Sequence, residues 1–177
     1  MEREITTLSE DALRHGYRVE IILAVQGNIA TTYDNLGRFE EALRIRRDVY
    51  SECLKPYGEE HEQTLQAANN YASTLVEAER FEQARVLIRR TIPVARRVLG
   101  EGHRLTLKMR ANYARALYKN PAATLDDLRE AVRTHEDAAP TVRRVFGGSH
   151  PLTVDIENEL RGARAALRAR EATPPSA

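Results

Sequence analysis

The sequence predicts an all-α solenoid, a row of stacked helix pairs, on three observations. First, the chain repeats itself, since Asn28, Asn70 and Asn112 are each 42 residues apart and the residues around them agree. Second, apolar residues recur at the three- and four-residue steps of an amphipathic helix, as in the run from Phe39 to Cys53. Third, no segment shows sustained strand alternation. One helix pair cannot bury its apolar face alone, so neighbouring pairs must stack.

We expect helices over residues 5–15, 19–36, 39–57, 61–79, 81–99, 103–119, 125–146 and 150–170. The first helix of each repeat, helix A, begins near a histidine and carries the repeated asparagine. The second, helix B, ends at a glycine in the strings YGEEH, LGEGH and FGGSH, where a left-handed cap is expected. These bounds predict a single helical repeat domain at 1–170, with repeats near 19–58, 61–100 and 103–147, a final helix at 150–170 and a disordered tail at 171–177.

The third repeat is longer than the others by five residues, which fall around YKNPAATLDD. Pro121 ends helix A there, and the run from Thr124 to Asp127 is typical of a capping box at the start of helix B. The two end helices have no partner in the pattern: the first, 5–15, resembles a helix B and the last a helix A.

Small residues recur where the two helices of a repeat should approach each other closely, because a larger side chain would overpack the contact. On helix A and helix B respectively, these residues are Ala30, Ala72 and Ala114, and Ala42, Ala84 and Ala131.

The composition excludes several classes of protein. The chain has 177 residues, of which 27 are basic and 26 acidic, and this balance argues against a nucleic-acid binder. An apolar content of 42% is too high for a disordered chain. The longest clean apolar run, 21–25, is too short to span a membrane, so no membrane partner is expected. The single Cys53 and the absence of an apolar stretch at the N-terminus favour a cytoplasmic protein.

No motif points to catalysis, a cofactor or a metal. His61, His103 and His150 occur once per repeat, too far apart to converge on one ion, and are interpreted as polar groups at helix starts. Cys53 lies on an apolar helix face and is interpreted as a packed thiol. The chain has no phosphate-binding glycine loop, nucleophile elbow or zinc-protease motif. We therefore expect a non-enzyme without cofactors.

The pattern N-[IY]-A-x-x-[YL] followed by G-R-F-E-E-A resembles the tetratricopeptide repeat. The 42-residue period, the NNYA-type helix A and the G-x-x-H link resemble the repeats of kinesin light chains in particular, over roughly residues 16–165. The resemblance implies a right-handed superhelix whose A helices line a concave groove. It also implies a protein-binding scaffold that holds short acidic cargo segments in that groove.

Matching the A-helix register to this groove gives a set of candidate peptide-binding residues. They are Asn28, Thr31, Gln66, Asn69, Asn70, Ser73, Lys108, Asn112, Arg115, Lys119, Asn158, Arg161 and Arg164. An asparagine amide both donates to and accepts from an extended peptide backbone, so a row of amides binds a chain without selecting one side chain. The alternative is that the asparagines bond neighbouring helices and hold the superhelix together.

Charge is distributed unevenly along the chain. Residues 1–100 carry 14 basic and 16 acidic side chains, and residues 101–177 carry 13 and 10, so the groove is expected to run from polar to basic. An acidic segment is the natural partner for the basic end, unless that end is only a solvated charged face.

Two other functions stay open from the sequence. In the first, the protein is a structural module that forms homo-oligomers through its unpaired end helices or belongs to a longer array. In the second, arginine runs such as Arg96–Arg97 bind RNA. Interleaved acidic residues offset those arginines and no aromatic platform accompanies them, so we expect no nucleic-acid partner.

Overall fold

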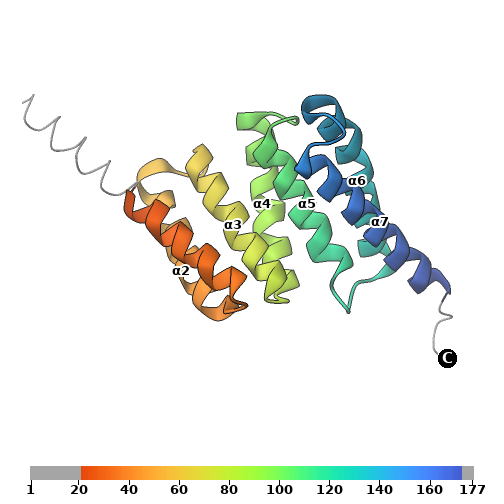
Figure 1. Cartoon of the computed structure of the whole chain (residues 1–177), viewed down its shortest axis with the longest axis horizontal. Helices are drawn as coiled ribbons and strands as arrows, with labels where there is room; N and C mark the ends of the chain where they lie inside the picture. The colour runs from red at the N-terminus through yellow and green to blue at the C-terminus, as the bar shows by residue number, and fades with distance from the viewer. Residues whose placement is uncertain (1–20, 173–177) are drawn as a thin grey trace, which may run out of the picture.

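The computed structural model describes residues 21–172, and these form a row of helices without any strand. Residues 21–35 are helical. Six further helices follow: α2 (Phe39–Tyr57), α3 (Glu62–Glu77), α4 (Phe81–Leu99), α5 (Arg104–Tyr118), α6 (Leu125–Phe146) and α7 (Pro151–Ala172). Figure 1 shows them side by side in chain order. The expected all-α solenoid is confirmed.

The helix bounds agree with the sequence to within two residues. The expected helix at 5–15 lies outside the described residues, as do residues 173–177 of the expected tail. The tail prediction was wrong for residues 171 and 172, which form the last turn of α7. Alanine and arginine are strong helix formers, and Arg170 ties this end to the third-repeat insertion by donating to the carbonyl of Ala123 at 2.7 Å.

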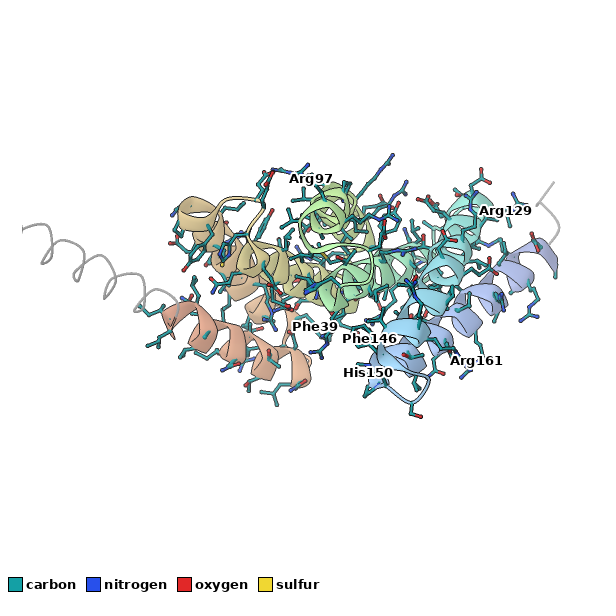
Figure 2. The ribbon with its side chains drawn as sticks, turned by 90° about the horizontal axis from the view of Figure 1, so that it is seen from above. Phe39, Arg97, Arg129, Phe146, His150 and Arg161 are labelled. Carbon is teal, nitrogen blue, oxygen red and sulfur yellow. The ribbon has the colours of Figure 1, made fainter. Side chains whose placement is uncertain are left out.

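The histidines at the starts of the A helices are N-caps, as expected. The Nδ1 atoms of His61, His103 and His150 accept the backbone N–H of the residue two positions on, at 3.2, 3.3 and 3.1 Å. Each bond satisfies one of the amides that a helix start leaves unpaired. The ring of His150 also stacks on Phe146 across the α6–α7 link, with the ring centroids 4.9 Å apart (Figure 2).

The predicted capping box at the start of α6 is also present. Thr124 accepts from the backbone N–H of Asp127, and the Asp127 carboxylate accepts from that of Thr124. The glycines that end the B helices have positive φ, but ψ lies near 160–180° instead of in the left-handed helical range. The chain therefore leaves each B helix in an extended direction that only glycine adopts easily.

The contacts between helices show which side of the row is concave. Each helix packs on the next, and α3 also contacts α5 while α5 contacts α7. The B helices α2, α4 and α6 make no comparable contacts with one another. The A helices therefore lie closer together than the B helices, which makes their side the concave inner face of the superhelix.

The arginine-rich B helices are paired with acidic residues. Arg80 contacts Glu40 at 2.6 Å and Arg97 contacts Glu60 at 2.6 Å, each joining two repeats. Arg97 and, further along, Arg129 project on the side where these B helices lie (Figure 2). Because the paired side chains are well exposed, each pair contributes at most about 1 kcal/mol.

One core position carries a different residue in each repeat. Arg46, Ile88 and His135 occupy equivalent places on the B helices, once the five-residue insertion is allowed for, and all are buried. His135 is fully buried, and neither ring nitrogen has a hydrogen-bond partner among the described residues. Burial, with Arg110 and Arg115 nearby, lowers the pKa of His135 to about 4.

Replacing His135 by isoleucine, the residue at this position in the second repeat, should therefore make the free energy of unfolding less dependent on pH. The stability that depends on neutral His135 is fully present only well above pH 6.5, the pKa of the unfolded state. As the pH falls below this value, the histidine is protonated in the unfolded state but stays neutral in the folded one. The free energy of unfolding therefore falls by about 3 kcal/mol between pH 6.5 and pH 4 on account of His135. Urea unfolding at pH 7, 5.5 and 4.5 should show a smaller loss in His135→Ile than in the wild type. Equal losses in both proteins would contradict the assignment.

The A–B link of the second repeat contains a strained residue. Glu79 has φ of 59°, where the first repeat has Gly37 with φ of 70°. A left-handed conformation costs a residue with a Cβ about 1 kcal/mol relative to glycine. Glu79→Gly should therefore raise the free energy of unfolding by about 0.5–1 kcal/mol, measured by urea denaturation. Gly37→Glu, the matched control, should lower it by a similar amount.

Candidate functional site

The inner face holds two neighbouring hollows. The first, of about 700 Å³, lies between helix 21–35 and α3, with part of α2 as its floor. The second, of about 480 Å³, lies across α3, α5 and α7. Asn70 lines both hollows, so they adjoin at the middle of α3.

The structure brings ten of the thirteen expected residues to these hollows. Asn28, Thr31 and Gln66 line the first, and Asn70 lines both. The second hollow is lined by Asn69, Ser73, Lys108, Asn112, Arg115 and Asn158. Lys119, Arg161 and Arg164 line neither hollow. The last two stand 47 residues after Ala114 and Leu117, positions that face helix B and not the groove.

The asparagines divide into two kinds. Asn112 Nδ2 donates to Asn69 Oδ1 at 3.1 Å across the α3–α5 contact, and the two residues are only 8% and 4% exposed. Asn70 is half-buried and accepts from Gln66 Nε2 at 2.8 Å on its own helix. The alternative of bonding between helices therefore holds for Asn69 and Asn112, whereas Asn28 and Asn70 present their amides at the hollows.

The floor of the first hollow contains a buried charge that the sequence analysis missed. Arg46 is 8% exposed and donates from Nη2 to Asp34 Oδ2 at 3.0 Å and to Thr31 Oγ1 at 2.9 Å. Thr74 also donates to Asp34 Oδ1, at 3.0 Å, so the network joins helix 21–35, α2 and α3. The available signal was an arginine at the core position that Ile88 fills in the next repeat.

The charges at the second hollow are nearly balanced. Arg115 pairs with Glu77 of α3 and lies 3.6 Å from Glu159 of α7. Lys108 has no ion pair within residues 21–172. Partial burial and Arg104 lower the pKa of Lys108, while Asp155 opposes them. Lys108 is therefore the basic group of this hollow that is available to a carboxylate.

No arrangement for metal or membrane chemistry accompanies the hollows. Across residues 21–172, no group of three or more His, Cys, Asp or Glu side chains is placed to hold a metal ion. None of the helices in that range is long and apolar enough to cross a membrane.

Comparison with known proteins identifies the repeat. Residues 21–97 match the family model of the tetratricopeptide repeat. This stretch of the chain therefore resembles tetratricopeptide repeats. Such repeats generally mediate protein–protein interaction. No curated protein matches the chain.

Two solved structures share the fold of this chain. The first contains the nearly identical repeats described for a kinesin light chain of Podosopora anserina. Its TM-score is 0.73 at 22% identity, covering 81% of this chain and 66% of that one. The second is BtubC (BKLC) from P. vanneervenii, with a TM-score of 0.64 at 16% identity, covering 90% and 68%. The chain thus spans about two thirds of the length of each.

The two kinds of asparagine should respond differently to mutation. Asn112→Ala removes the donor that satisfies Asn69 Oδ1 in a buried contact, so it should lower the free energy of unfolding by about 1–3 kcal/mol. Asn70→Ala removes only an exposed bond on its own helix and should cost less than about 0.5 kcal/mol. Urea denaturation at pH 7 compares them, and equal losses would show that the buried bond is not important.

Proposed function

We propose that the inner face binds an extended segment of a partner protein, with preference for an acidic segment. The observation that carries this is the pair of adjoining hollows, which together follow the inner face from helix 21–35 to α7. A continuous concave surface fits an extended polypeptide better than a compact small molecule. Because the hollows already lie along the A helices, such a segment can bind without any rearrangement of the array.

The groups at the hollows support recognition of a backbone. Asn28 and Asn70 offer amides that both donate and accept, and Ser73 and Asn158 add further polar groups. Apolar residues such as Leu23 and Val49 at the first hollow fit an apolar side chain of the bound segment. The segment is therefore bound mainly through its main chain, with one apolar anchor at the first hollow.

The acidic preference rests on Lys108 in this proposal. Arg115 already contacts two glutamates, and Arg161 and Arg164 lie outside the hollows, so the basic end is less positive than its composition suggests. A carboxylate of the bound segment placed against Lys108 forms a charge-assisted bond in a partly buried setting. The selectivity for acidic segments is therefore expected to be moderate and to weaken with salt.

The chain offers a matched test, because its lysines occupy different places. Peptides selected from a random display library on the wild-type protein should be enriched in Asp and Glu. Lys108→Met should weaken their binding about tenfold, the loss of one charge-assisted bond. Lys55→Met should leave it unchanged, since Lys55 is exposed on α2 and contacts Glu52 away from both hollows. Fluorescence anisotropy measures both.

Asn70→Ala tests the groove separately from the charge. The substitution should lower the affinity for acidic and neutral peptides equally, because Asn70 lies where the two hollows meet. Selected peptides that bind Asn70→Ala and Lys108→Met as tightly as the wild type would contradict the inner face as the binding site.

A further inference from the structure

Helix 21–35 carries an exposed apolar stripe on the side away from α3. Ile21, Ile22, Val25 and Ile29 are 48, 53, 51 and 44% exposed, and Leu36 just beyond the helix is 65% exposed. Their spacing places them within about 100° of one another around the helix axis. The stripe, defined by these five residues, exposes roughly 500 Å² of apolar surface, about the size of the largest patches that monomeric proteins tolerate.

In the second repeat, residues at the equivalent positions are covered by the preceding helix. Residues 42 further on from Ile22 and Val25 are Thr64 and Ala67, 1% and 6% exposed. Thr64 donates to the carbonyl of Cys53 at 3.3 Å, and Ala67 packs with Val49 and Cys53 on the preceding helix B. Ile22 and Val25 of the stripe thus occupy positions that a preceding helix covers in the second repeat, where the side chains are smaller.

The other end of the array is different. In α7, Arg161 and Arg164 stand where α5 has the packing residues Ala114 and Leu117. Arg161 is exposed, and Arg164 contacts Glu136 at 2.6 Å. Stacking copies head to tail would place the apolar stripe against these charges and desolvate them, which is unfavourable. Pairing the stripe with itself across a twofold axis buries apolar surface on apolar surface.

Residues 1–20 have a poor sequence for covering the stripe in the manner of a helix B. One period before the core residues Arg46, Val49 and Cys53, the chain has Glu4, Thr7 and Asp11. The register that covers helix A elsewhere would therefore bring two acids and a hydroxyl against the stripe, with Thr7 and Asp11 in place of the apolar Val49 and Cys53, at a cost in desolvation.

We propose that two copies of the chain associate through this stripe, isoleucine against isoleucine across a twofold axis. The two stripes together bury roughly 1,000 Å² of apolar surface, which is enough for a specific but weak dimer. The proposal is independent of peptide binding. Its consequence is a particle with two inner faces, which would bind a partner carrying two segments more tightly than a partner carrying one.

Sedimentation velocity on the full chain, from about 1 to 200 μM, tests the proposal across the range expected for a weak interface. We expect a concentration-dependent shift from the 20.0 kDa chain to twice that mass. Val25→Lys should weaken association at least about tenfold. The double variant Ile22→Thr/Val25→Ala should do the same, and it uses the residues that the second repeat has at these positions, so it should fold. Val86→Lys, on α4 and 69% exposed outside the stripe, should have no effect.

Three outcomes would overturn the proposal. The first is a wild type that stays monomeric throughout the range, and the second is a dimer that both stripe variants leave intact. The third is a monomer whose unfolding free energy falls in Val25→Lys but not in Val86→Lys, since that would assign the stripe to residues 1–20. Circular dichroism on every variant shows that a lost dimer is not a lost fold.

Discussion

Close contact between the two helices of each repeat is the constraint on which the rest of the structure depends. The six alanines at this contact are completely buried in all three repeats: Ala30, Ala42, Ala72, Ala84, Ala114 and Ala131. Side chains this small let helix A approach helix B, and a larger one would force the pair apart. The same spacing lets α3 meet α5 and α5 meet α7, so one row of helices forms a continuous inner face.

The polar residues of the inner face fall into two groups that are physically distinct. The buried Asn69–Asn112 bond and the Asp34–Arg46–Thr74 network hold adjacent repeats in register. An unpaired amide or charge at those places would be costly, so these groups act as part of the core. Asn70 and Lys108 lie on the same helices but make no bond between repeats among the described residues, and in the proposed function they are the groups that contact the bound segment. On that proposal, stability and binding depend on different side chains that are close neighbours in the sequence.

The ends of the array are asymmetric for the same packing reason. Every helix A has one face for the preceding pair and one for its own helix B. In helix 21–35 the first of these faces is apolar and exposed, while in α7 the second carries Arg161 and Arg164. A charged face disfavours the stacking of a further apolar helix, whereas an apolar face favours association. The stripe and the arginines therefore give the solenoid a direction.

The sequence by itself determined the helices and their caps, because those depend on local pattern. The 42-residue period, the histidine N-caps, the capping box at Thr124 and the alanine contacts all follow from residues close together in the chain. Only the tertiary structure decided what each polar side chain does. Asn69 and Asn70 are adjacent in sequence, yet Asn112 of α5 bonds the buried Asn69 amide, whereas the Asn70 amide bonds within its own helix and is half-buried at the hollows. From the sequence, Arg115 is expected to be free to bind a carboxylate of a ligand. In the folded chain it contacts Glu77 of α3 and Glu159 of α7 instead. Those partners are 38 and 44 residues away, and such distances are closed by helix packing, which one repeat's pattern does not contain.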